Sequence, residues 1–237
     1  MKFFKILLTL CVLLLIAIVG YYAFYPDISR LKRENPKKTS FMEYREEEWR
    51  QQGKRIRIQK KWASLSNISP YLIKAALITE DAKFWSHQGF DFEAIQKALE
   101  KDIKKKKFKF GGSTISQQLV KNLYLTPSKN AVRKFKEAIL TWRIEQNLSK
   151  RRILELYLNV VEWGEGIFGI EAASLHYYGK PAFQLNPDEA AHLAVILPNP
   201  RKYRLDGSSR YVEKRAKIIY DIMVKRGIVE PEYEDVE

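Results

Sequence analysis

The feature that most constrains this chain is the uncharged stretch from Ile6 to Tyr25 near its start. The stretch is dominated by leucine, isoleucine and valine, and a helix of about 20 such residues can cross the hydrocarbon core of a bilayer. The tyrosines at its end are typical of an interfacial aromatic belt. A cleaved signal peptide is the alternative, but its apolar core is usually shorter and no A-x-A cleavage site follows here. The sequence therefore predicts an uncleaved transmembrane anchor over residues 6–25, preceded by a short segment, 1–5.

The charges around the anchor leave its orientation open. Lys2 and Lys5 precede it, whereas several more basic residues follow it between Arg30 and Lys38. The positive-inside rule would keep the more basic flank in the cytoplasm. Charge alone therefore does not place the body of the protein outside the cytoplasm.

The composition calls for an anionic partner, because the 237 residues carry a formal net charge of +14. Nucleic acid, an anionic membrane surface and a phosphorylated substrate are the candidates. The length allows one domain with a sizeable core and a flanking segment or two. Cys11 is the only cysteine and the three histidines lack metal-ligand spacing. We therefore predict no internal disulfide and no metal-ligating residues.

The segment after the anchor, residues 26–61, is polar and heavily charged, with no long apolar period. We interpret it as a charged linker or loosely packed leading segment, with Trp49 and Trp62 docking onto the body. From residue 62 to residue 237, apolar residues recur at helical spacing and no alternating strand is evident. Helix starts are indicated at Ser69-Pro70, Asp91, Ser113, Ser128 or Asn130, Ser149, Asn186 and Ser209. The body is predicted to be mainly α-helical.

Two glutamates lie at the end of apolar rows. The first predicted helix begins at Pro70, and its apolar stripe continues through Leu77 toward Glu80. Burial would disfavour the charge of this carboxylate and raise its pKa, although a glutamate turned to solvent is the alternative. Glu137 lies on the apolar row of a later helix, one turn after Arg133. An exposed salt bridge would explain that second pair equally well.

A glycine-containing turn, Gly111–Thr114, lies between these glutamates and opens a helix for which Ser113 is a good N-cap. Such a turn exposes unpaired N–H groups and the positive end of the helix dipole, which favour an anion such as phosphate. Lysines precede the turn between Lys104 and Lys109, interleaved with Phe108 and Phe110. This pattern fits a loop at a membrane surface, with a solvated loop as the alternative.

Four stretches of the chain, in this order and spacing, resemble the peptidoglycan glycosyltransferase family, the polymerase module of class A penicillin-binding proteins and their single-function relatives. The stretches are Glu80–Asp91, which matches E-D-x-x-F-x-x-H-x-G; Gly111–Asn122; Arg133–Glu137 continued by Ser149–Asn159; and Gly169–Ser174 with Tyr177–Lys180. The resemblance covers roughly Trp62 to Gly227. Because the partner motifs of a penicillin-binding transpeptidase are not found, we expect a monofunctional biosynthetic transglycosylase of bacteria with an outer membrane.

This resemblance implies a two-lobed, lysozyme-like helical glycosyltransferase domain over residues 62–237, whose smaller lobe dips into the bilayer. Members of the family polymerise lipid II. The 4-hydroxyl of an incoming sugar attacks the anomeric carbon of the donor with inversion, forming a β-1,4 linkage and releasing polyprenyl diphosphate. The implied partners are lipid II, the polyprenyl-diphosphate-linked glycan chain, inner-membrane lipid and cell division or elongation proteins, with no nucleic acid. Because lipid II is presented outside the inner membrane, a single-pass protein with a periplasmic catalytic domain and a cytoplasmic N-terminus is expected.

The resemblance also implies roles for individual residues. Glu80 matches the catalytic base, and Glu137 matches the second catalytic carboxylate, which helps diphosphate departure directly or through a divalent cation (Mg or Mn); no required cofactor is implied. The expected substrate-binding residues are Asp81, Ser113, Thr114, Gln117, Gln118, Lys121, Lys129, Arg133 and Lys134. His87, Glu155 and Glu171 also belong to the motifs, and we expect structural roles for them.

Two other functions are compatible with parts of this pattern. A lysozyme-like or lytic-transglycosylase enzyme that cleaves peptidoglycan would also place a catalytic glutamate in a helical body. It would need neither a cationic donor site nor a membrane anchor. A membrane-tethered basic binding protein would need neither Glu80 nor Glu137, and carboxylates in a basic cleft would oppose nucleic-acid binding.

Overall fold

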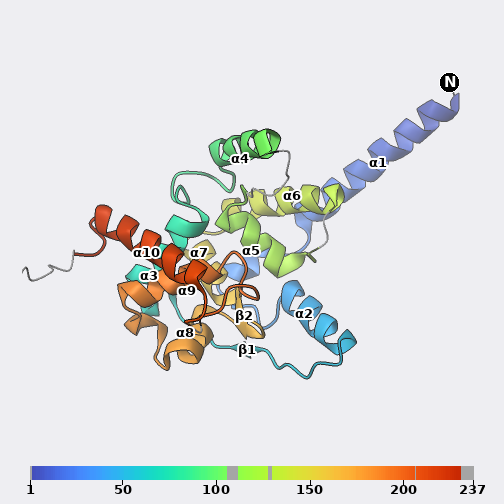
Figure 1. Ribbon diagram of the computed structural model, residues 1–237. Coiled ribbons are helices and arrows are strands. Elements are labelled where there is room, and N and C mark those ends of the chain that lie inside the picture. Colours follow the sequence, from blue (N-terminus) through green and yellow to red (C-terminus); the bar gives the residue numbers. More distant parts are fainter. Residues whose placement is uncertain (1, 106–111, 128–129, 206, 231–237) are drawn as a thin grey trace, which may run out of the picture.

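The computed structural model describes residues 2–105, 112–127, 130–205 and 207–230, which form one long apolar helix and a helical body (Figure 1). The helices are α1 (Lys2–Phe24), α2 (Ser40–Gln51), α3 (Pro70–Glu80), α4 (Phe92–Lys105), α5 (Ile115–Tyr124), α6 (Ala131–Asn147), α7 (Lys150–Val160), α8 (Ile170–Tyr178), α9 (Pro187–Ile196) and α10 (Arg210–Lys225). Short 3-10 helices occur at η1 (Ile28–Lys32), η2 (Leu65–Asn67) and η3 (Ala182–Gln184). The expected mainly α fold is confirmed.

The N-terminal helix α1 projects away from the body (Figure 1). Its stretch Lys2–Tyr22 is long and apolar enough to cross a membrane, and none of it is buried inside the protein. A helix that exposes leucine, isoleucine and valine on all sides is unfavourable in water but suited to lipid. The predicted anchor therefore forms a helix that could be a membrane anchor.

The segment from 26 to 61 is not a loosely packed linker, which corrects our interpretation. Ile28 and Leu31 of η1 are buried in the main hydrophobic core. Met42 and Trp49 of α2 are each only 1% exposed and pack in a second, smaller cluster. Each of these short elements buries only two hydrophobic residues among many charges, so no long apolar period marks them in the sequence. The body therefore begins before residue 62, although the docking of Trp49 was correctly expected.

A small sheet was also missed from the sequence. Its strands are β1 (Gln59–Lys60), β2 (Glu162–Gly164) and β3 (Ile167–Phe168), in the order β1-β3-β2. β1 pairs with β3 in parallel, with Gln59 opposite Ile167, and β2 pairs with β3 in antiparallel, with Glu162 opposite Phe168. Strands of two or three residues are too short to produce a recognisable alternation. Through β1, the sheet ties the leading segment to the body.

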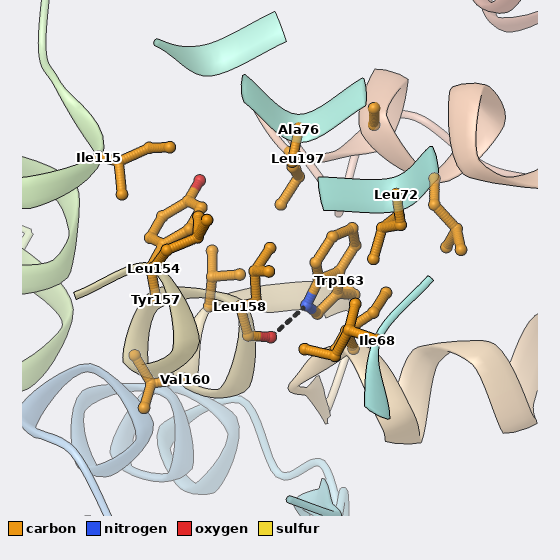
Figure 2. Close-up of a cluster of buried hydrophobic side chains, with 14 of the residues drawn as sticks. Ile68, Leu72, Ala76, Ile115, Leu154, Tyr157, Leu158, Val160, Trp163 and Leu197 are labelled. Atoms are coloured by element: carbon orange, nitrogen blue, oxygen red, sulfur yellow. Dashed lines mark hydrogen bonds between the residues drawn. The ribbon is translucent and has the colours of Figure 1, made fainter. Parts of the chain in front are cut away.

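The core is centred on α7, where nearly all residues from Ile153 to Val160 are buried. Leu154, Tyr157, Leu158 and Val160 of this helix are fully buried (Figure 2). Trp163, just after the helix, donates its Nε1–H to the Leu158 carbonyl oxygen at 3.3 Å. Helices α5, α6 and α8 contact α7, whereas α3 packs against α9 and α10. The helix that carries Glu80 is thus held by a different part of the body from the helices that carry the basic residues.

Most of the predicted helix starts are confirmed, and most of their caps are local hydrogen bonds. Ser69 precedes α3 with Pro70 in its first turn, Asp91 accepts from the Ala94 N–H at α4, and Asn130, Ser149, Asn186 and Ser209 cap α6, α7, α9 and α10. The prediction of Ser113 as the N-cap of α5 is wrong. Thr114 caps this helix and forms a reciprocal capping box with Gln117, so the T-x-x-Q signature starts one residue later.

Two glycines with positive φ, one on each side of α8, differ in the space around them, so replacing each with alanine tests how closely the backbone packs there. Gly169, before α8, has φ +84°, and a Cβ there would lie 2.7 Å from the Asn159 carbonyl oxygen. Gly179, after α8, has φ +66° with nothing within 4 Å of an added Cβ. We expect Gly179→Ala to lower the free energy of unfolding by about 1 kcal/mol through left-handed strain alone. Gly169→Ala should cost roughly 3 kcal/mol or more, because a steric clash adds to the strain.

Urea unfolding of the two variants measures this difference directly. Equal losses would contradict the close approach of the α7 and α8 backbones at Gly169.

Candidate active site

Glu80 is the last residue of α3 and lies against the helix α5. Gln118 of α5 donates its Nε2–H to Glu80 Oε2 at 2.6 Å. The Tyr157 hydroxyl of α7 donates to Gln118 Oε1 at 3.3 Å, which fixes the amide with its NH₂ group toward the carboxylate. Three helices thus determine the orientation of the Glu80 carboxylate. The alternative of a helix-end glutamate turned to solvent is wrong.

The surroundings of Glu80 raise its pKa above the ordinary glutamate value. Burial is the largest cause, and the negative charge of Asp81 acts in the same direction. The hydrogen bond from Gln118 and the positive charge of Lys121 oppose this effect. A carboxylate with a raised pKa that keeps partial exposure is suited to accept a proton from a bound hydroxyl.

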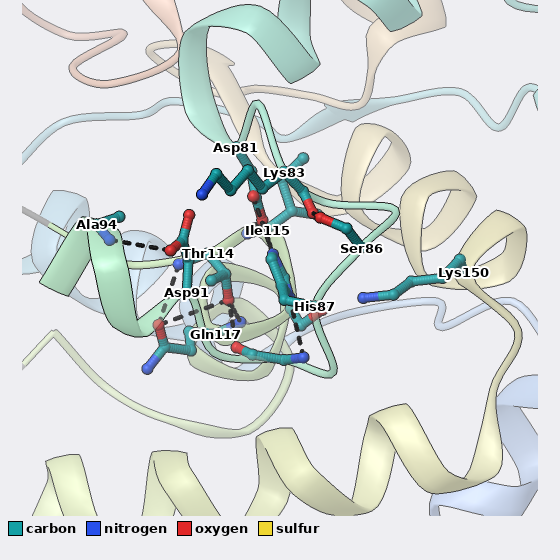
Figure 3. Close-up of polar contacts among 12 residues, drawn as sticks. Asp81, Lys83, Ser86, His87, Asp91, Ala94, Thr114, Ile115, Gln117 and Lys150 are labelled. Atoms are coloured by element: carbon teal, nitrogen blue, oxygen red, sulfur yellow. Dashed lines mark hydrogen bonds and ion pairs between the residues drawn. The ribbon is translucent and has the colours of Figure 1, made fainter.

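The neighbouring carboxylate, Asp81, joins the end of α3 to the start of α5 (Figure 3). His87 Nε2 lies 2.9 Å from Asp81 Oδ1, and the Ile115 N–H donates to Asp81 Oδ2 at 3.0 Å. The Gly89 N–H donates to His87 Nδ1 at 3.1 Å, so the imidazole carries its proton on Nε2 and donates it to Asp81. Asp81 is only 7% exposed. Its position favours a structural role for both Asp81 and His87.

The start of α5 differs from the open anion site that its glycines suggested. The Thr114 N–H donates to Gln117 Oε1, the Ile115 N–H donates to Asp81, and the Gln117 N–H donates to Thr114 Oγ1. The Asp81 carboxylate also faces the positive end of the helix dipole. These three N–H groups are therefore already satisfied within the protein. The anion site expected at this helix start stays a prediction, and side chains would contribute to it in place of these three groups.

A second buried carboxylate, Glu137 of α6, lies among cationic side chains. It is 2% exposed, Arg133 donates to its Oε2 at 2.7 Å, and Lys134 donates to its Oε1. Burial lowers the pKa of Lys121 of α5, whereas the negative charges of Glu137 and Glu80 raise it. Lys121 therefore lies within electrostatic reach of both carboxylates. The alternative of an exposed surface salt bridge at Glu137 is wrong.

The remaining predicted residues fall into three groups. Thr114 and Gln117 are buried in the capping box, and Thr114 Oγ1 also donates to the Gly89 carbonyl oxygen at 2.7 Å. Ser113 is exposed beside them. Lys129 lies outside the described residues, as do Phe108 and Phe110. The structure thus groups six of the predicted residues: Glu80, Gln118, Lys121, Arg133, Lys134 and Glu137. Asp81, Thr114 and Gln117 instead form hydrogen bonds that hold the start of α5.

Further polar residues that flank the site serve the fold. Glu155 Oε2 accepts from the Leu65 N–H at 2.9 Å, and Glu171 Oε2 accepts from the Ala182 N–H at 2.9 Å, which agrees with the structural roles expected for them. Tyr157 was missed because its contact with the Gln118 amide depends on how α7 and α5 pack. A tyrosine between Leu156 and Leu158 in the buried part of α7 is the only signal that could have indicated it, since a buried hydroxyl needs a hydrogen-bond partner.

The described residues do not themselves build a complete site for a divalent cation. Both carboxylate oxygens of Glu137 are engaged by cationic side chains. Within the described ranges, no three His, Cys, Asp or Glu side chains are grouped so that they could hold a metal ion. The proteins that bind Mg²⁺ commonly supply carboxylates free to coordinate it. We therefore derive no step through a metal ion.

The site thus brings Glu80, a partly exposed carboxylate of raised pKa, together with Lys121 and the cationic side chains around Glu137. The model of the transglycosylase family matches residues 47–224. The biosynthetic peptidoglycan transglycosylase of Dechloromonas aromatica (strain RCB) is 50% identical over 185 residues, which cover 78% of this chain and 80% of the relative. That of Nitrosomonas eutropha (strain DSM 101675 / C91 / Nm57) is 46% identical over 210 residues, which cover 89% of this chain and 86% of the relative. A third, from Nitrosospira multiformis (strain ATCC 25196 / NCIMB 11849 / C 71), is 43% identical over 218 residues and covers 91% and 95%. The chain belongs to the transglycosylase family, and the expected lysozyme-like helical class is confirmed.

The two buried carboxylates should respond in opposite ways to neutralisation. Because the pKa of Glu80 is raised in the folded protein, its charge is less favourable there than in the unfolded chain at neutral pH. We expect Glu80→Gln to increase the free energy of unfolding at pH 7. This gain should disappear below the ordinary value of 4.5, where the carboxyl is protonated in both states. Denaturant unfolding at a series of pH values measures the effect.

Glu137→Gln is the matched comparison. It removes the negative partner of Arg133 and Lys134 and should lower the free energy of unfolding at pH 7. The same sign for both variants would contradict the different electrostatic surroundings assigned to Glu80 and Glu137.

Proposed function

We propose that this protein polymerises lipid II into β-1,4-linked glycan strands with release of polyprenyl diphosphate. It is a glycosyltransferase of peptidoglycan synthesis, in which Glu80 is the base and Glu137 organises the cations for the leaving group. The observation that carries this proposal is that Gln118 of α5 donates to Glu80 at 2.6 Å while Lys121, three residues further along the same helix, is influenced by the charges of both Glu80 and Glu137. Proton acceptor and diphosphate site are thereby combined in one place.

In the bond-forming step, Glu80 accepts the proton of the acceptor hydroxyl. The 4-hydroxyl oxygen of the acceptor sugar attacks the anomeric carbon of the donor while its proton moves to the Glu80 carboxylate. The bond from that carbon to the diphosphate oxygen breaks, and attack from the opposite face inverts the α-linked donor to a β linkage. Gln118 supports this step because its hydrogen bond holds the carboxylate in one orientation. The raised pKa makes Glu80 a stronger proton acceptor than an ordinary glutamate.

Departure of the diphosphate needs positive charge more than it needs a proton. Lys121, Arg133 and Lys134 supply that charge, and a low-dielectric site increases its effect. Glu137 lies beneath Arg133 and Lys134 and holds both cations at the site through its two oxygens. We assign Glu137 this positioning role toward the leaving group. Ser113 and Lys129 remain predicted substrate contacts.

The exposed apolar faces support a position at the membrane surface. Helix α4, at the edge of the body, exposes Phe92, Ile95, Leu99 and Ile103 at helical spacing (Figure 1). An amphipathic helix with such a face is unfavourable in water and suited to the lipid interface. We propose a single-pass inner-membrane protein with α1 as its anchor, α4 dipping into the outer leaflet and the catalytic body in the periplasm. Cell division or elongation proteins are proposed partners on the same membrane.

The proposal is tested with labelled lipid II and purified full-length protein in detergent. Wild-type protein should produce glycan polymer, and Glu80→Gln should lower its rate of formation by about 100-fold or more, the usual range for removing a general base. Asp221→Asn, an exposed carboxylate on α10, is the control and should keep the wild-type rate.

Digestion of preformed glycan without polymer would instead identify a peptidoglycan-cleaving enzyme. A near-normal rate for Glu80→Gln would remove Glu80 as the base.

A further inference from the structure

The end of the membrane helix is fastened to the catalytic body by one buried arginine. Arg143 of α6 donates from Nη1 to the Tyr22 carbonyl oxygen at 3.0 Å and from Nη2 to the Phe24 carbonyl oxygen at 3.2 Å. The last carbonyls of a helix have no partner within that helix, and they form the negative end of its dipole. A guanidinium group is suited to such a helix end because it is positively charged and can donate to two oxygens at once.

A second contact from α6 supports the same attachment. The Lys136 ammonium group lies 5.0 Å from the centre of the Tyr22 ring, within the range of a cation–π interaction. Lys136 and Arg143 are seven residues apart on α6 and therefore share one face of that helix. Directly after the anchor, Ile28 and Leu31 enter the main core. The end of α1 is thus held by two side chains of α6 and by the burial of the segment that follows it.

The anchored helix α6 is also the helix that carries Arg133, Lys134 and Glu137. A cavity of about 260 Å³ lies between the end of α1 and the start of α6, and its walls include Tyr22 and Arg133. The end of the anchor and the cationic start of α6 are therefore neighbours.

Arg143 is well suited to hold this geometry because it has few other partners for its charge. It is 9% exposed, and none of the ion pairs found among the described residues includes it. Its charge is compensated by the carbonyls of Tyr22 and Phe24, so release of the anchor would leave a buried charge poorly satisfied. The contact therefore favours one fixed arrangement of anchor and body over a freely hinged one.

We propose that Arg143 is a positioning residue that fixes the membrane helix to α6 and thereby holds the diphosphate-binding side chains at a set height above the bilayer. This inference rests on the proposed function. The diphosphate of a lipid-linked substrate lies at the level of the lipid headgroups. A site held at that level meets the diphosphate without drawing the lipid chain out of the membrane, whereas a hinged body would meet it less often.

The first test measures the geometry without any substrate. Cys11 lies in α1 and is the only cysteine of the chain, so Lys217→Cys on the exposed side of α10 provides a second site for spin labels. In full-length protein reconstituted in phospholipid vesicles, we expect a narrow distribution of distances between the two labels. Arg143→Gln should broaden it, and Arg143→Lys, which keeps the charge but lacks the two-pronged donor, should be intermediate.

The second test compares two substrates. With long-chain lipid II in vesicles, Arg143→Gln should lower polymerisation about tenfold, the effect of losing charge-assisted hydrogen bonds. With a short-chain, detergent-dispersed lipid II analogue, its rate should stay near that of wild-type protein, because the height of the site no longer matters. Arg215→Gln, an exposed arginine on α10, is the control and should match wild-type protein on both substrates.

An unchanged distance distribution in Arg143→Gln would overturn the proposal, as would an equal loss on both substrates, which indicates a general structural defect. If Arg143→Gln does not fold, Arg143→Lys decides by the same two measurements. Wild-type protein that polymerises neither substrate would contradict the proposed function, while the distance measurement would still decide on the attachment of the anchor.

Discussion

The site depends on the two hydrogen bonds that Asp81 accepts, from the His87 imidazole and from the Ile115 N–H. One oxygen holds the loop after α3 and the other holds the first turn of α5. Because Glu80 directly precedes Asp81, these bonds also place the proposed base beside Gln118 on α5. The carboxylate offsets the positive end of the α5 dipole at the same time. A residue first considered as a substrate contact is thus the connection between the two halves of the site.

The charged side chains of the site depend on one another. Burial raises the pKa of Glu80 and lowers the pKa of Lys121, so each group is held in a less favourable state than in water. Glu137 offsets part of the cost at Lys121, because its negative charge raises the pKa that burial lowers. An incoming diphosphate would add negative charge where cations exceed carboxylates. The folded protein is therefore less stable than it would be with an uncharged side chain at Glu80, the position where the chemistry requires a base.

Features that depend on neighbouring residues could be predicted from the sequence, whereas those that depend on packing could not. The caps at Asp91, Asn130 and Ser149 are local hydrogen bonds between residues close in the chain. The motifs indicated Glu80 and Glu137, but not that the start of α5 is closed by Asp81 and the capping box. The contacts of Tyr157 with Gln118 and of Arg143 with the anchor join segments far apart in the chain. No periodicity or spacing could have indicated them.

The most direct test of the account is the rate of glycan polymerisation by Asp81→Asn, measured with lipid II on protein whose helical content is unchanged. Asparagine has the shape of aspartate but offers only one acceptor, so its NH₂ group must face either the His87 N–H or the Ile115 N–H. If Asp81 holds Glu80 in place, the rate should fall about tenfold or more, since a buried donor left without an acceptor disrupts the connection. A rate equal to that of wild-type protein would show that the position of Glu80 does not depend on Asp81.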